Sequence, residues 1–173
     1  MRRWIVALVV WAGVLALSMP AMAQGRPAGW GIGLGSGTAI TGVSLKNQMG
    51  ERALQAVIGC WGGYRNNCYG LGASVDLLIN MPLITEDDTV QLAWNLGGGG
   101  AIGLRSGGWA RHPHGDWRGD SLWLGGQFVA GLEFIFPKVP LDVVLEWRPT
   151  LFVIPTARLW IEHAGFHVRY YFQ

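Results

Sequence analysis

Residues 121–136, SLWLGGQFVAGLEFIF, decide the fold class because their side chains alternate in character with a period of two. One face is apolar throughout: Leu122, Leu124, Gly126, Phe128, Ala130, Leu132, Phe134 and Phe136. The other face mixes glycine and apolar residues with Gln127 and Glu133. A two-residue period held over such a length indicates a β-strand and argues against a helix.

The same alternation recurs along the chain and predicts eight strands. We expect them near 29–36, 39–47, 52–61, 69–79, 90–104, 121–136, 141–153 and 164–172. Short connections near 48–51, 81–88 and 137–140 alternate with longer ones at 62–68, 105–120 and 154–163, and only the gap around Gly37 and Thr38 departs from this rule. The pattern predicts an all-β fold, an eight-stranded antiparallel up-and-down transmembrane β-barrel.

The two faces of the strands differ in bulk, which indicates which one points outward. Large apolar side chains occupy one face, and glycine is frequent on the other. An eight-stranded barrel has an interior just wide enough for side chains to fill. We therefore expect the bulky face to meet lipid and the glycine-rich face to line the lumen.

Ionisable residues within the predicted strands fall on the glycine-rich face. They form a predicted lumen charge cluster of three cations and three anions: Lys46, Asp76, Glu133, Glu146, Arg148 and Arg169. Asp142 and His167 share this parity nearer the strand ends. A basic side chain on the lipid face at mid-depth costs about 2–4 kcal/mol, whereas paired charges inside offset their desolvation. The cluster predicts a salt-bridged plug in place of a water-filled pore.

The first 23 residues have the composition of a cleaved secretory signal. Arg2 and Arg3 precede an uncharged run from Trp4 to Leu17, and small residues, Ala21 and Ala23, mark a cleavage site before Gln24. We predict a signal peptide at 1–23, a barrel domain at 24–173 and an outer-membrane location in a Gram-negative cell envelope.

Charge removes one class of partner for the predicted mature chain. Without Arg2 and Arg3, the 13 basic residues fall to 11, equal to the 11 acidic ones. A nucleic-acid-binding domain would show a basic excess. We expect a monomer whose partners are outer-membrane lipid and lipopolysaccharide.

Cys60 and Cys68 bracket the segment WGGYRNN at the two ends of a predicted hairpin loop. In an oxidising envelope this spacing suits a cross-strand disulfide, and two unpaired thiols are the alternative. Two cysteines alone form no metal pattern.

The connection 105–120, RSGGWARHPHGDWRGD, holds the remaining candidate ligands. His112, His114 and Asp116 are suitable metal ligands by type, although a solvated loop is the simpler interpretation. Trp109, Trp117 and Arg111 suit contacts with lipopolysaccharide sugars and phosphates. The tripeptide 118–120, Arg-Gly-Asp, is too short to carry an adhesion function.

Two rival functions stay open at this point. A lipid A-modifying barrel enzyme needs a serine, a histidine and a carboxylate in one arrangement. The candidate pairs are His163 with Glu162, His167 with Tyr171 and Ser74 with Asp76, and none has a deacylase-like spacing. A soluble periplasmic lipocalin-like barrel is the other rival. We expect no catalytic residue, no cofactor and no metal site.

Several segments resemble a family of small uncharacterised bacterial outer-membrane β-barrel domains of the outer-membrane protein A type. They are 131–155, GLEFIFPKVPLDVVLEWRPTLFVIP, and 165–172, GFHVRYYF, with GTAITGVSLK at 37–46 and ASVDLL at 73–78. The resemblance implies an eight-stranded transmembrane barrel and no particular activity. It also implies recurring polar lumen positions at Lys46, Asp76, Glu133, Glu146 and Arg169.

The last predicted strand is the proposed closing strand of the barrel. Phe166, Val168, Tyr170 and Phe172 are expected to face lipid, and Arg169 to point toward Glu133 and Glu146. We expect the strand to pair with the first strand around 30–34, which removes its open edge. The terminal aromatic resembles the signal read by the barrel-assembly machinery, but here Gln173 follows Phe172.

Overall fold

A computed structural model describes residues 25–37, 40–62, 68, 70–105, 111–112, 115–116 and 121–172. The predicted signal peptide, Gln173 and most of the 105–120 connection lie outside these ranges. Within the described ranges no helix is long and apolar enough to cross a membrane.

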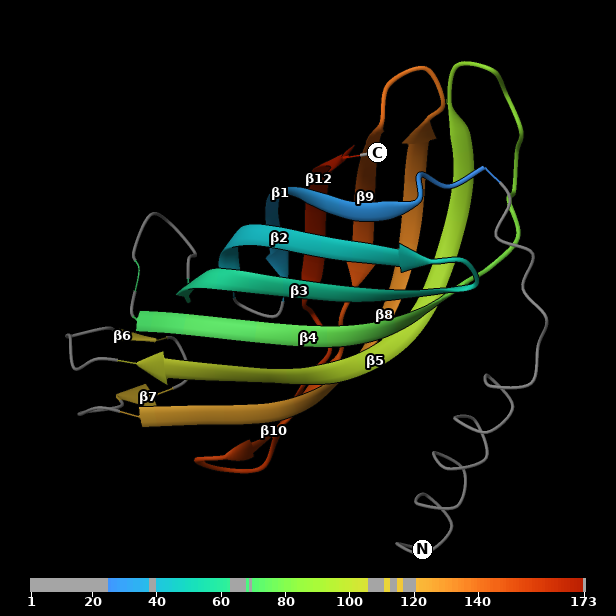
Figure 1. The fold of residues 1–173 in the computed structure, drawn as a ribbon. Helices are drawn as coiled ribbons and strands as arrows, with labels where there is room; N and C mark the ends of the chain where they lie inside the picture. The colour runs from blue at the N-terminus through green and yellow to red at the C-terminus, as the bar shows by residue number, and fades with distance from the viewer. Residues whose placement is uncertain are drawn as a thin grey trace, which may run out of the picture.

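The described chain forms a closed antiparallel β-barrel (Figure 1). Its strands are β1 (Gly29–Gly37), β2 (Ile40–Met49), β3 (Arg52–Trp61), β4 (Gly70–Asn80), β5 (Gln91–Arg105), β8 (Ser121–Phe136), β9 (Leu141–Trp147), β10 (Thr150–Ile154), β11 (Arg158–Trp160) and β12 (Ala164–Phe172). Consecutive strands pair from β1 to β5, β5 pairs with β8, and β8 pairs with both β9 and β10. Strand β1 pairs with β12 from Trp30↔Phe172 to Ser36↔Phe166. Two residues each of β6 (Arg111–His112) and β7 (Gly115–Asp116) form a separate ladder.

The predicted seventh strand, 141–153, is interrupted in the middle without losing its register. Trp147 pairs with Ala130, and Thr150 pairs with Gln127, so three residues on one strand match three on the other. Pro149 has no N–H to donate to the ladder, although its carbonyl still accepts from the Phe128 amide at 3.0 Å. Strands β9 and β10 therefore act as one wall strand.

The eighth wall strand is also made of two pieces, β11 and β12, but here the register slips. Trp147 and Thr150 are three residues apart, whereas their partners Ala164 and Trp160 are four apart. One extra residue, a β-bulge, reverses which face the following side chains occupy. The bulge turns Trp160 toward the interior, which period-two alternation from β12 would not predict. With these two continuations the wall has eight strands.

The two ends of the barrel differ. The chain enters β1 and leaves β12 at one end, here called the terminal end, together with the connections 50–51, 81–90 and 137–140. The opposite loop end carries the connections 38–39, 62–69, 106–120 and 155–157.

In the 81–90 connection the Thr89 amide donates to Asp87 Oδ1 at 2.8 Å, and this hydrogen bond lowers the pKa of the Asp87 carboxyl.

Inward-facing glycines allow the strands to bend tightly around a narrow interior. At Gly33, Gly42, Gly59, Gly97 and Gly99, an added Cβ would overlap backbone atoms of the neighbouring strand. Glycine therefore permits the close strand approach that strong coiling requires. The pronounced curvature of β5 is visible in Figure 1.

Candidate functional site in the barrel interior

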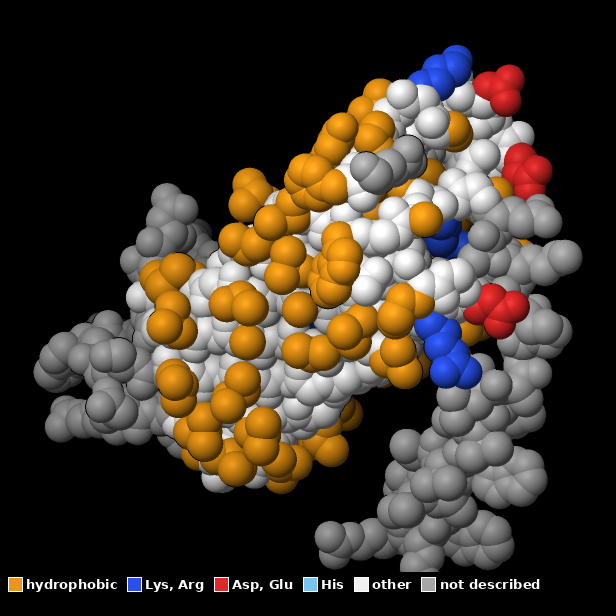
Figure 2. Space-filling model, in the orientation of Figure 1, with side chains coloured by type: hydrophobic (Ala, Val, Ile, Leu, Met, Phe, Trp, Pro, Cys, Tyr) orange, Lys and Arg blue, Asp and Glu red, His pale blue; other side chains and the backbone are white. Residues whose placement is uncertain are grey.

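The barrel interior holds many polar and charged side chains, and the outer face of its wall is apolar. Sixteen polar or charged residues of the described chain are buried, among them Lys46, Asp76, Glu133, Arg148 and Arg169, each fully inaccessible. Large apolar side chains are exposed along the outer face of the wall strands, for example Leu34, Ile58, Val75 and Leu145. Figure 2 shows hydrophobic side chains spread over the visible face of the barrel wall, with charged groups gathered at the terminal end. This is the reverse of a soluble protein, which buries apolar groups and exposes charges.

At the terminal end, Glu133 on β8 is held between two cations. Lys46 Nζ on β2 lies 2.5 Å from Glu133 Oε1, and Arg26 Nε, from the segment before β1, lies 2.9 Å from Oε2. Gln48 reaches the same carboxylate at 3.5 Å. A buried carboxylate needs such partners because its desolvation costs several kcal/mol.

The next layer is centred on Asp142 at the start of β9. It accepts from Arg169 Nε at 3.1 Å and from the Tyr171 hydroxyl at 2.8 Å, and Lys46 Nζ lies 3.7 Å away. Arg169 also donates through Nη1 to Gln55 Oε1 at 2.6 Å. Arg169 points into the interior as expected, but its hydrogen bonds do not go to Glu133 or Glu146. The direct partners of Arg169 are Asp142 and Gln55.

Arg148, next to Pro149, links the two remaining acids. Its Nε lies 2.6 Å from Glu146 Oε2, and its Nη2 lies 2.6 Å from Asp76 Oδ2. Gln127 donates to the other oxygen of Asp76. Gln55 joins this layer to the previous one, because its Nε2 donates to Glu146 Oε1 at 3.0 Å. The interior is thus one connected network of charge-assisted hydrogen bonds, which are stronger than neutral ones.

A serine, a histidine and a carboxylate do meet inside the barrel, but not in any of the pairs expected from sequence. Ser44 Oγ lies 3.0 Å from His167 Nδ1, and His167 Nε2 lies 3.0 Å from Glu146 Oε2. Ser44 and His167 are fully buried, and a Cβ on Gly35 would overlap the His167 ring. A nucleophile needs a reacting carbonyl within about 3–3.5 Å. In the arrangement described, Ser44 is fully buried and its hydroxyl is hydrogen-bonded to His167.

The loop end of the interior is filled by aromatic side chains. Phe152 packs edge-on against Trp61 and Trp123, with ring centroids 5.7 and 5.5 Å apart, and Trp160 lies 5.2 Å from Phe152. Ile40, Val57 and Ala101 complete this aromatic cluster. The expectation that bulky residues belong outside is wrong here. Gly72 and Gly103 provide the space, because a Cβ on either would overlap the Trp61 ring.

The structure brings all six residues of the predicted charge cluster into the interior and adds others to them. Sequence reasoning missed Arg26, which precedes the first strand, and the partners Gln55, Gln127 and Ser44, which are uncharged. The sequence does carry a signal for Gln55, Gln127 and Ser44. By strand alternation, each lies on the same face as a charged residue of its own strand or of the adjacent strand.

Two further sequence predictions concern the loop end and the closing strand. Cys60 and Cys68 form a disulfide, as predicted. Phe166, Val168, Tyr170 and Phe172 all lie on the outer face of β12, and the pairing with β1 spans the predicted residues Trp30 to Leu34.

The candidate metal ligands of the 105–120 connection cannot be assembled from the described residues. His114 lies outside them, and for His112 and Asp116 only the short β6–β7 ladder is described. Across the part of the chain that is described, no group of three histidine, cysteine or carboxylate side chains has a metal-binding arrangement.

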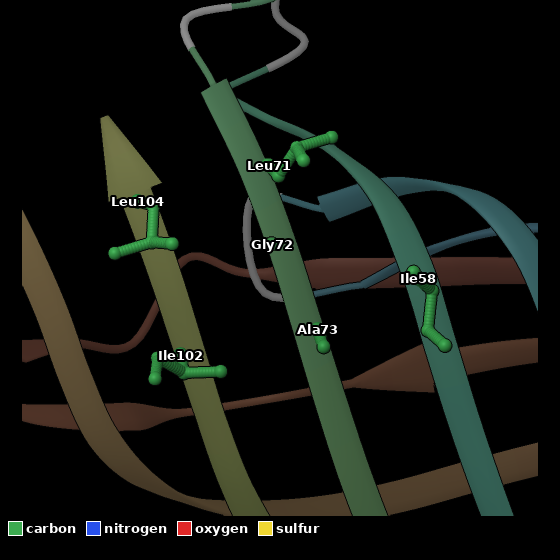
Figure 3. A pocket seen from close by; sticks show the side chains of 6 residues that line it. All are labelled: Ile58, Leu71, Gly72, Ala73, Ile102 and Leu104. Atoms are coloured by element: carbon green, nitrogen blue, oxygen red, sulfur yellow. The ribbon is translucent and has the colours of Figure 1, made fainter. Parts of the chain in front are cut away.

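A shallow groove of about 190 Å³ marks the outer face of β3, β4 and β5 near the loop end. It is lined by Ile58, Leu71, Gly72, Ala73, Ile102 and Leu104 (Figure 3). The long side chains stand at its edges, and its floor is low because outward-facing Ala73 carries only a methyl group.

No protein-family model, no curated protein and no solved structure matches this chain. The family resemblance of its strand sequences therefore stays a prediction.

Proposed function

We propose that this protein is an exported outer-membrane β-barrel that has a structural role in the bacterial envelope, with its lumen plugged by the charge network. The single observation that carries the proposal is the inverted distribution of polarity. Arg148 and Arg169 are fully buried, while Leu34 and Leu71 are 72% and 70% exposed. Exposing so much apolar surface to water is unfavourable by roughly 25 cal/mol per Å². Hydrocarbon is the solvent in which this arrangement is favourable.

The dimensions of the wall support the same proposal. Strand β8 has 16 residues. At a rise of about 3.3 Å per residue and a tilt of about 40°, such a strand spans about 40 Å, which exceeds the roughly 25 Å apolar band of an outer-membrane barrel.

Aromatic side chains at the terminal end support an interfacial position there. Trp30, Tyr170 and Phe172 are exposed and adjacent, because Trp30 pairs with Phe172. Tyrosine and tryptophan prefer the boundary between lipid and water, where one edge of the ring stays polar and the rest is apolar. The apolar groove of Figure 3 would lie within the lipid band, where acyl chains fill irregular surfaces.

The proposal is tested by fractionating cells that produce the full chain and by gel mobility. We expect the protein in the outer-membrane fraction after a carbonate wash, which strips peripheral proteins. We also expect a mobility in dodecyl sulfate gels that changes on boiling, because a folded barrel resists the detergent. A protein recovered in the aqueous fraction without detergent would instead support the soluble lipocalin-like alternative.

The lipid A-modifying alternative has its own readout. If the Ser44–His167–Glu146 relay is catalytic, lipid A from cells lacking the protein should differ in mass, and His167→Ala should reproduce the difference. We expect unchanged lipid A, because the relay is enclosed by the wall and by Gly35. His163→Ala tests the other candidate pair, His163 with Glu162, and we expect it to leave lipid A unchanged as well.

A further inference from the structure

Residues 25–28, here called the N-terminal strap, cross the mouth of the barrel at the terminal end. Strand β5 is four places from β1 in the closed eight-stranded wall, so the two strands lie on opposite sides. Arg26 nevertheless reaches the far wall, because its Nη2 donates to the Trp94 carbonyl of β5 at 3.0 Å and its Nε to Glu133 of β8 at 2.9 Å. Figure 1 shows the same segment running from β1 toward β5.

The strap is fixed by its side-chain contacts and not by the sheet. The ladder of β1 begins only at Gly29, which pairs with Gln48. Gly25 adopts a φ of +82°, a conformation that favours glycine, and lies against the Gln91 side chain of β5. The Arg26 side chain is 3% exposed although it belongs to the end of the described chain.

The wall next to the strap is a polar layer made of Asn80, Gln91 and Asn95. In the described part of the chain, eight buried side-chain atoms have no hydrogen-bond partner within the protein. Five of them belong to Arg26 and this layer: Arg26 Nη1, Asn80 Oδ1, Gln91 Oε1, Asn95 Oδ1 and Asn95 Nδ2. Donors and acceptors are mixed, which matches water better than an ion of either sign.

The opposite exit is closed by different chemistry. Beyond the ion network, the aromatic cluster of Trp61, Trp123, Phe152 and Trp160 fills the loop end. In the described barrel, small polar species therefore reach the polar layer only through the terminal mouth.

We propose that the N-terminal strap is a closure on this mouth and that Arg26 is its latch. The latch depends on the arginine fork, since a planar guanidinium can bond a carboxylate and a carbonyl at once, and an ammonium on a flexible stem is less suited to both. Release of the strap exposes the polar layer and Glu133 to the solvent of the terminal side.

The test measures the reaction rate of a buried thiol in purified, detergent-folded protein. Asn95→Cys places the thiol in the polar layer, far from the Cys60–Cys68 disulfide at the loop end. A small cationic methanethiosulfonate should modify it slowly while Arg26 is present. Adding Arg26→Ala should raise the rate of thiol modification by at least about tenfold. Without Arg26, the strap can open without breaking the two hydrogen bonds that hold it. Arg26→Lys should give an intermediate rate.

Arg52→Ala is the matched control, since Arg52 is an exposed arginine at the same end of the barrel. It should leave the rate unchanged. Equal rates with and without the Arg26→Ala substitution would overturn the latch, as would fast labelling while the native strap is present. Ala93→Cys, a buried site paired with Glu133, repeats the measurement if Asn95→Cys fails to give a heat-modifiable band. Because the assay uses purified protein, its outcome is independent of where the barrel resides in the cell.

Discussion

Glycines on the inner and outer faces of this barrel differ in how much space surrounds them, as the neighbours Gly125 and Gly126 show. A Cβ on inward-facing Gly125 would lie 2.8 Å from the Leu151 carbonyl oxygen and 2.9 Å from Phe152 Cδ1. A Cβ on outward-facing Gly126 would meet nothing closer than 3.9 Å. The first glycine is needed for packing, and the second is not.

We therefore expect Gly125→Ala to lower the free energy of unfolding by about 1–3 kcal/mol, the usual cost of overpacking. Gly126→Ala should be neutral or stabilising by up to about 1 kcal/mol, because it restricts the unfolded chain. Urea titration of the two variants in lipid vesicles measures the difference. Equal effects would show that the inner wall relaxes around an added methyl group.

Arg148 provides the second prediction at this scale. Arg148→Met removes the cation between Asp76 and Glu146. We expect the free energy of unfolding to fall by about 3–5 kcal/mol, because the two buried carboxylates then lose their partner. Adding Asp76→Asn should restore at least about 1 kcal/mol, since the two residues interact directly. Arg52→Met, at an exposed site, should change stability by less than about 0.5 kcal/mol. A loss at Arg148 no greater than at Arg52 would contradict a stabilising role for the network.

Strand alternation placed the six ionisable residues of the cluster on the correct face, because period two is a property of the strand itself. It could not identify which cation meets which anion. Arg169 pairs with Asp142, its register partner on β9, and not with the more distant Glu133. Which side chains form an ion pair inside a closed barrel depends on the register between strands and on the length of the side chains. The alternation within a single strand does not reveal that register.

At the scale of elements, the disulfide ties the end of β3 to the segment that leads into β4. Closing a loop with a sequence separation of eight is expected to contribute about 2–3 kcal/mol by restricting the unfolded chain. The double variant Cys60→Ser/Cys68→Ser should lose that amount in urea titration. A reductant should lower the free energy of unfolding of the native protein by the same amount, and it should leave that of the double variant unchanged. A shift in the double variant would point to an effect of the reductant elsewhere.

Two interruptions of the wall strands have different physical causes. Pro149 interrupts the hydrogen-bond ladder but keeps the register, so β9 and β10 still read as one alternating segment. The bulge at 161–163 changes the register by one residue, so Trp160 faces inward and the aromatic cluster gains its fourth ring. Bulges are set by tertiary contacts and leave little trace in local hydropathy.

For the whole molecule, the decisive question is which solvent surrounds the wall. Val75 is 52% exposed in the middle of β4, and we expect Val75→Arg to cost about 2–4 kcal/mol in vesicles if the wall faces lipid. Ile84→Arg, in the 81–90 connection, should cost less than about 0.5 kcal/mol, as exposed substitutions do. Equal, small effects at both sites would mean that water surrounds the wall, and the membrane proposal would then fail.

The pairing of β1 with β12 has a consequence for the order in which the chain can fold. The contacts that complete the wall join Trp30 to Phe172, residues separated by almost the whole described chain. Contacts of such long range slow folding, because chain entropy is lost before they form. Every shorter intermediate has two unpaired edges, which attract other chains. The chain is therefore expected to be most prone to aggregation in the interval before β12 pairs with β1.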